Sequence, residues 1–213
     1  MIRSSSVLRR TVPAVGALVA AVVLSACGVS HPGAAAVVGQ DKITVSAVQA
    51  RMAAVRSEGA AQSSGQPAAS YQEPADLAQA TVAQMVMSAV VAHALATNGL
   101  SVSDTEIART RQAEAQELGG EPALEQMLLV KQAVPTGQID AFYREWLGLQ
   151  KLAGLSGQQI GSPQAATAVR QLLAQSATDL KVSVNPRYGS WDDQQGVLNG
   201  PSAAWLPPAA PAA

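Results

Sequence analysis

Cysteine is almost absent from this sequence, which contains one, Cys27, among 213 residues. A disulfide needs two cysteines, so the fold must rely on its own hydrophobic core. Histidine is nearly as rare, with His31 and His93 as the two that occur. Metal sites need several His, Cys or carboxylate ligands at close spacing, and no Asp, Glu or Cys lies within a helical turn of His93. The sequence therefore predicts no metal site and no cofactor, and His93 is interpreted as a core histidine or as one at a helix-packing edge.

Aromatic residues and basic clusters are scarce as well. Phe, Trp and Tyr make up 3% of the chain, so its core must be built mainly from Leu, Val, Ala and Met, which suits packed helices. The formal net charge is −1, without the clustered basic face that a nucleic-acid partner requires. The sequence contains neither a Gly-rich phosphate loop nor a nucleophile elbow. These absences argue against nucleic-acid binding and against an enzyme.

The N-terminus has the pattern of an export signal. Residues 1–10 carry three arginines and no acid, and an apolar run follows over residues 11–24. That run has the length of a secretory core and is too short to span a membrane as a helix. The tetrapeptide LSAC, which ends at Cys27, looks like a bacterial lipobox. This likeness implies cleavage between Ala26 and Cys27 and a diacylglyceryl group on the thiol. We therefore predict a lipoprotein with signal peptide 1–26, anchored in lipid at the extracytoplasmic face of the cell membrane.

Hydrophobic periodicity, caps and breaks divide the remaining chain into a tether, a helical body and a tail. Small residues mark 27–35 as a tether, and the Ala- and Pro-rich residues 194–213 are expected to be disordered. Residues 36–193 then form one domain. A capping box at Ser46 opens its first helix, and a mobile loop is expected over residues 58–71. The predicted helices span residues 46–57, 74–97, 104–118, 122–132, 138–155 and 163–179.

The most apolar helix and the last strand predict how this body is packed. Residues 81–96 are apolar nearly all round but include polar residues, which favours a central buried helix over a second membrane span. Residues 180–185 alternate apolar and polar side chains, as a half-buried strand does. Such a strand needs a backbone partner, and the other strand-like runs lie within residues 37–45. We therefore predict a mainly α fold, a helical bundle lobe closed by a small sheet that pairs the N- and C-terminal segments of the domain.

The two ends of this domain carry sequences that resemble a known family. The stretch VVGQDKIT begins at Val37 and NPRYGSWD begins at Asn185. With the signal and the helices, they resemble the SurA/PrsA group of extracytoplasmic foldases, and within it the chaperone domain called the SurA N-terminal domain. In those foldases a parvulin isomerase domain lies between the last bundle helices, where this chain has only the break 156–163. Parvulin sites use histidines, so the resemblance implies a chaperone domain without isomerase activity.

Two groups of apolar residues could line a groove for client polypeptides. The first group is the helical stripe that places Ile139, Phe142, Trp146 and Leu149 on one face. The second group is the pair Met85 and Met87, because methionine adapts well to varied apolar partners. The candidate client-binding residues are Phe142, Trp146, Met85 and Met87. The alternative is that the stripe on residues 139–149 is ordinary core packing.

Two functions are consistent with these observations. One is a membrane-anchored, extracytoplasmic chaperone-like lipoprotein that holds unfolded or exported polypeptides without ATP or isomerase activity. The other is an envelope lipoprotein that serves as a scaffold or binding module for one dedicated partner or a small ligand. An exposed apolar concavity between the packed helices is the feature to look for in either case.

Overall fold

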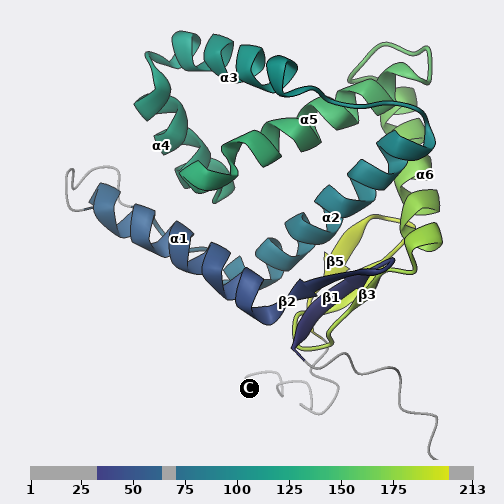
Figure 1. The fold of residues 1–213 in the computed structure, drawn as a ribbon, viewed down its shortest axis with the longest axis horizontal. Helices are drawn as coiled ribbons and strands as arrows, with labels where there is room; N and C mark the ends of the chain where they lie inside the picture. The colour runs from purple at the N-terminus through teal and green to yellow at the C-terminus, as the bar shows by residue number, and fades with distance from the viewer. Residues whose placement is uncertain (1–32, 64–70, 202–213) are drawn as a thin grey trace, which may run out of the picture. The chain divides into compact units, whose positions relative to one another are not determined.

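The computed structural model describes residues 33–63 and 71–201, which contain six α-helices and five short strands (Figure 1). The strands are β1 (Ala34–Val38), β2 (Asp41–Thr44), β3 (Ser183–Val184), β4 (Ser190–Asp192) and β5 (Val197–Asn199). The helices are α1 (Val45–Ser63), α2 (Leu77–Thr97), α3 (Asp104–Leu118), α4 (Glu121–Gln132), α5 (Ile139–Gly154) and α6 (Pro163–Leu180), with a 3₁₀ turn at Thr136–Gln138. This confirms the mainly α class. The predicted signal peptide, with Ala26 and Cys27, lies outside the described residues.

A three-stranded antiparallel sheet closes the helical body, as the sequence predicts. Its order is β2-β1-β3, and the N-terminal strand β1 pairs with β3 in the register that sets Ala36 opposite Val184. The C-terminal strand is shorter than the predicted 180–185. α6 continues to Leu180, and Lys181 ends it with left-handed backbone at φ 49°. Apolar alternation therefore identified the pairing partner but not the point where helix gives way to strand.

α2 is the central helix of the described lobe and contacts α1, α5, α6 and β1. Its buried residues include Val82, Val86 and Leu95. Of the described helices, α2 is the one whose length and composition would also suit a membrane span, and its packing inside the lobe agrees with the predicted central buried helix. α5 approaches α2 closely at Gly148, where a Cβ atom would lie 2.9 Å from Leu95 Cδ1.

The first strand and the first helix begin differently from their predictions. β1 begins at Ala34, inside the expected tether 27–35, and its alanines are buried in the core. Alanine has a low strand propensity, so the start of this strand at Ala34 could not be read from its composition. α1 is capped by Thr44, whose Oγ1 accepts the amide hydrogen of Ala47 at 3.0 Å, and the predicted cap at Ser46 is wrong.

α1 also ends later than predicted, at Ser63. The expectation of a loop from residue 58 is therefore wrong for residues 58–63. Gly59 is buried, and a Cβ atom at this position would lie 2.2 Å from Cδ1 of Tyr71. The helix is thus packed against a tyrosine that follows it in the chain, a contact that the Gly-, Ser- and Gln-rich composition did not indicate.

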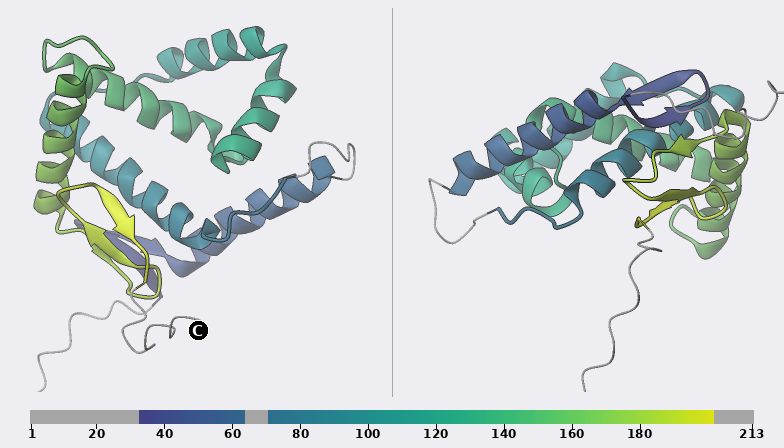
Figure 2. Two further views of the ribbon diagram at one scale, coloured as in Figure 1. Left: turned by 180° about the vertical axis from the view of Figure 1, so that it is seen from behind. Right: turned by 90° about the horizontal axis from the view of Figure 1, so that it is seen from below.

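The segment after residue 193 contains a strand that composition did not indicate. β4 and β5 form an antiparallel hairpin in which Leu198 is buried. The carboxylate of Asp192 accepts backbone hydrogen bonds within the turn, and Gln79 of α2 donates a hydrogen bond to the Leu198 carbonyl oxygen at 2.7 Å. The expected disorder is therefore wrong for residues 194–201, and residues 202–213 lie outside the described residues. Figure 2 shows this hairpin and the sheet close together beside α6.

The NPRYGSWD segment joins the sheet to the hairpin. Asn185 donates a backbone hydrogen bond to β1, and its side-chain oxygen accepts the Arg187 amide hydrogen at 3.1 Å. The Tyr188 ring is buried in the core, with the Arg187 guanidinium carbon 5.1 Å from its centroid. Gly189 has φ 129°, and a Cβ atom there would lie 1.9 Å from the Asn199 carbonyl oxygen. The segment therefore closes the lobe, with Asn185, Tyr188 and Gly189 each held by a contact or a backbone requirement.

Candidate functional site

The four candidate client-binding residues do not form a single site. Met85 is half-buried and packs against the core that surrounds β1. Met87 and Phe142 line one hollow, whereas Trp146 lines another. The structure therefore separates residues that the sequence grouped together. The two hollows have different lining residues, so each has its own chemistry.

The buried face of α5 differs from the predicted stripe. Ile139 is buried as expected, but the deeply buried aromatic residue is Tyr143, which is 1% exposed, while Trp146 is 42% exposed. The Tyr143 hydroxyl donates a hydrogen bond to Glu114 of α3 at 2.7 Å. Burial, reinforced by this hydrogen bond, raises the pKa of Tyr143. The alternative that the stripe on residues 139–149 is ordinary core packing is therefore wrong for Trp146. Its partly exposed indole is available to contact other molecules.

Trp146 belongs to an apolar groove of about 380 Å³ between α5 and α6, which we call the α5/α6 groove. Gln150 and Arg170 are among its polar lining residues. The groove adjoins the connection between the two helices, and Ile160 in this connection is 59% exposed. Its apolar lining residues are Trp146, Leu149, Ala153, Ile160, Ala165, Ala166, Val169 and Leu173.

Aromatic packing fixes the position of Trp146. The Tyr143 and Trp146 ring centroids are 6.5 Å apart with an interplanar angle of 84°. Phe142 meets Tyr143 in the same edge-to-face manner at 5.5 Å. Such contacts stabilise aromatic pairs beyond simple burial. Because Tyr143 is buried in the core, its ring supports the indole of Trp146 from below, while part of the indole stays exposed.

A second hollow, the α2/α5 cavity, has a volume of about 530 Å³ and is lined by α2, the end of α4, α5 and β5. Met87 and Phe142 contribute apolar surface from the two helices, and Val197 and Leu198 contribute it from the hairpin. Glu145 is the polar residue of α5 that lines the same cavity. The cavity therefore combines apolar walls with a carboxylate.

The environment of Glu145 is electrostatically unusual. Burial raises its pKa, an effect opposed by a hydrogen bond from Ser88 of α2 and by the charge of Arg51. Arg51 of α1 is itself partly buried, and burial lowers the pKa of its guanidinium. Arg51 donates its hydrogen bond to Gln84 at 2.8 Å, and within residues 33–63 and 71–201 Glu145 forms no ion pair. Sequence analysis did not identify Glu145; the polar Ser88 in the most apolar helix, which donates to it, was the one sequence signal that pointed to this place.

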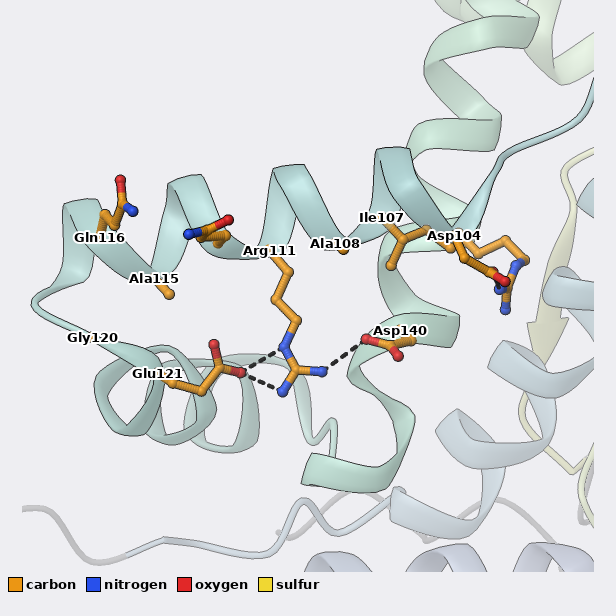
Figure 3. Close-up of a pocket in the computed structure, with 11 residues that line it drawn as sticks. Asp104, Ile107, Ala108, Arg111, Ala115, Gln116, Gly120, Glu121 and Asp140 are labelled. Atoms are coloured by element: carbon orange, nitrogen blue, oxygen red, sulfur yellow. Dashed lines mark hydrogen bonds and ion pairs between the residues drawn. The ribbon is translucent and has the colours of Figure 1, made fainter.

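A third hollow, of about 470 Å³, lies among α3, α4 and α5 (Figure 3). These helices follow three sides of a triangle in Figure 1, and Arg111 reaches across it to Glu121 and Asp140. Arg144 on α5 pairs with Asp104 on α3 at 2.6 Å. The charged side chains here are thus satisfied by one another, so this hollow is best explained as a structural brace.

The N-terminus of α3 is joined to α5 by a further charged contact. Ser103 and Glu106 form a capping box at the start of α3, and Lys151 of α5 pairs with Glu106 at 2.6 Å. Hydrogen bonds from Lys151 and then from Ser103 lower the pKa of Glu106 to about 2. The ionised carboxylate therefore contributes to stability above its unfolded pKa, and this contribution declines as pH falls toward the folded value.

Residues 33–63 and 71–201 contain no group of three or more His, Cys, Asp or Glu side chains placed to hold an ion. His93 is half-buried on α2, and its carbonyl oxygen accepts a hydrogen bond from Thr97. The described surface combines apolar grooves with charged side chains, several of which form ion pairs.

Comparison with known proteins gives one match. A family model described as the SurA-like N-terminal domain matches residues 5–117. The comparisons with curated proteins and with solved structures each gave no match. The family match ends in α3, so it does not reach the NPRYGSWD segment; the pairing of β3 with β1 joins that segment to the matched part of the chain.

Proposed function

The chain belongs to the family of the SurA-like N-terminal domain, a non-catalytic chaperone module, and on this premise we propose that it holds unfolded, exported polypeptides at the outer face of the cell membrane. The membrane attachment in this proposal is the lipid on Cys27. The holding surface is the α5/α6 groove. Neither ATP nor prolyl isomerisation takes part.

The observation that carries this proposal is the exposure of large apolar side chains around the α5/α6 groove. In a chain with 3% aromatic residues, Trp146 is placed at the surface and supported from beneath by Tyr143. Exposed apolar patches bordered by polar residues are typical of sites that bind other molecules, and rigidly held tryptophans often dominate such binding. An unfolded polypeptide offers apolar side chains that fit this surface without requiring a particular sequence.

The expected strength of binding suits a holding role. Burying a large apolar side chain completely contributes about 1.5–3 kcal/mol, and Trp146 and Ile160 are already partly buried. A groove of about 380 Å³ accommodates only a few client side chains. After the cost of ordering a flexible chain is subtracted, weak and reversible binding remains. Such binding delays aggregation but lets the client leave and fold.

The holding proposal predicts that the full chain in lipid nanodiscs suppresses light scattering by a model aggregating client at stoichiometric concentration. Replacing Trp146 with serine should raise the concentration needed for half-suppression by about five- to tenfold, because the main apolar contact is lost. Ile160→Ser should act in the same direction. Light scattering during client dilution from denaturant measures the effect.

Leu118→Ser is the matched control for this experiment. Leu118 is 40% exposed on α3, close to the exposure of Trp146, and lines none of the hollows described above. It should suppress scattering as well as the wild type. The proposal fails if the wild type does not suppress scattering, or if Leu118→Ser is as defective as Trp146→Ser. Crosslinking from position 160 that captures one stoichiometric protein, instead of many exported chains, would favour the dedicated-partner alternative.

Membrane anchoring has an independent test. Replacing Cys27 with alanine removes the only thiol of the chain and should leave unprocessed precursor or release the protein from membranes. The two acyl chains that the lipobox implies would otherwise hold it firmly, because one chain alone binds membranes only marginally. Intact mass and membrane fractionation report the result. If the mass and the fractionation are the same for the variant and the wild type, lipidation at this position is excluded.

A further inference from the structure

The α2/α5 cavity has a charge that its own lining does not neutralise. Asp76 and Glu145 are the ionisable residues that line it, and its lining includes no lysine, arginine or histidine. Asp76 is exposed just before α2, and its side chain does not cap the helix. The charges of the third hollow, which lies among α3, α4 and α5, are neutralised within it, because Arg111 and Arg144 pair with carboxylates there. The α2/α5 cavity therefore offers negative charge to an occupant.

Glu145 retains capacity to bind a donor. A carboxylate can accept about four hydrogen bonds, and among the described residues Ser88 supplies the one that Glu145 receives. Burial raises the pKa of Glu145, and the hydrogen bond from Ser88 and the charge of Arg51 offset this only in part. The ionised form of a partly buried carboxyl group is stabilised when a cation binds beside it. Arg51 acts on Glu145 only through space, since its hydrogen bond goes to Gln84.

The dimensions of the cavity indicate an extended polypeptide. Along α2 its lining runs from Asp76 to Met87, a separation of about 16 Å at the rise of an α-helix. About five residues of extended chain cover that length. Leu77, Phe142 and Val197 provide apolar surface around the carboxylates, so a basic side chain could enter while its neighbours bury apolar groups.

We propose that the α2/α5 cavity is a second binding site, which takes a lysine or arginine side chain of an extended polypeptide segment whose neighbouring side chains are apolar. Glu145 receives the cationic group, and Asp76 adds negative charge at the edge. The inference rests on the proposed holding function, because it assumes that the ligand is an unfolded polypeptide. It adds a preference that the apolar α5/α6 groove does not supply.

The test compares two fluorescent peptides that differ in one charge. Both alternate leucine and serine around a central residue, which is lysine in one peptide and Nε-acetyl-lysine in the other. The full chain in nanodiscs of uncharged lipid should bind the lysine peptide about tenfold more tightly, as expected for a partly buried charge pair. Glu145→Gln should remove this preference, and fluorescence anisotropy measures both affinities.

Two further variants control for charge and for folding. Glu117→Gln removes a carboxylate from the exposed face of α3 and should keep the tenfold preference. Val197→Lys places a cation on an exposed residue that lines the cavity, so it should weaken lysine-peptide binding while keeping the Glu145 side chain in place. If Glu145→Gln fails to fold, Val197→Lys still tests whether the cavity binds the lysine peptide.

Each outcome decides the proposal. Equal affinity of the wild type for the two peptides, or a preference that persists in both Glu145→Gln and Val197→Lys, overturns the cavity assignment and leaves the holding function intact. If neither peptide binds, the holding function fails as well. A dimer in sedimentation that dissociates in Val197→Lys would assign the cavity to a second copy of this chain and overturn the proposal.

Discussion

Replacing Gly189 with alanine is expected to lower the free energy of unfolding by at least about 3 kcal/mol. Gly189 has φ 129°, a backbone conformation that side chains with a Cβ atom rarely adopt. A Cβ atom at this position would also lie 1.9 Å from the Asn199 carbonyl oxygen. Because that atom belongs to the backbone of β5, rotation of a side chain cannot relieve the clash. Either the hairpin separates or the connection to β3 shifts.

Both consequences of the Gly189 substitution reach the core. Leu198 on β5 and Tyr188 beside the glycine are buried in the core cluster that contains β1. Urea unfolding followed by far-UV circular dichroism measures the loss, and amide hydrogen exchange over residues 190–199 locates it. The matched control is Gly154→Ala, because a Cβ atom there meets nothing within 4 Å. That substitution near the end of α5 should leave stability unchanged or raise it slightly. Equal stability of Gly189→Ala and the wild type would contradict the closing role of this segment.

The closing of the lobe could be predicted from the sequence, but the hairpin that completes it could not. Residues 180–185 alternate clearly enough to indicate a strand, and the other strand-like runs lie near the N-terminus, so the pairing followed. β5 has three residues in an Ala-, Pro- and Gly-rich region. Its stability depends on the hydrogen bond from Gln79 and on the burial of Leu198, both contacts between distant parts of the chain. The strand propensity of individual residues cannot predict contacts between distant parts of the chain.

The candidate site shows the same division between local and tertiary information. Helical periodicity placed α5 correctly, but it could not distinguish Tyr143 from Trp146 as the buried aromatic residue. That choice depends on α3 and α4, which cover the Tyr143 side and provide Glu114 for its hydroxyl. Glu145 was missed for a related reason. On α5 alone it is an ordinary helix carboxylate, and only the position of α2 makes it a partly buried group.

Replacing Tyr143 with alanine is expected to lower the free energy of unfolding by about 3–5 kcal/mol. Tyr143 is the largest fully buried side chain among the described residues, at 1% exposure. It packs with Ile107 of α3 and Leu124 of α4, so its loss would leave a cavity where three helices meet. Such cavities are costly because the surrounding helices relax only partly. Urea unfolding monitored by far-UV circular dichroism gives the change.

Tyr143→Phe separates the ring from its hydroxyl and links this residue to the proposed holding surface. It removes only the hydrogen bond to the partly exposed Glu114 and should cost about 1 kcal/mol. Because the edge contact with Trp146 is retained, Tyr143→Phe should suppress client aggregation as well as the wild type. Tyr143→Ala removes this support, so under conditions where it is still folded it should bind clients more weakly. If Tyr143→Ala were no less stable than Tyr143→Phe, the central packing of α3, α4 and α5 described above would be wrong. If it were folded and fully active in holding, the groove would not depend on a rigidly supported tryptophan.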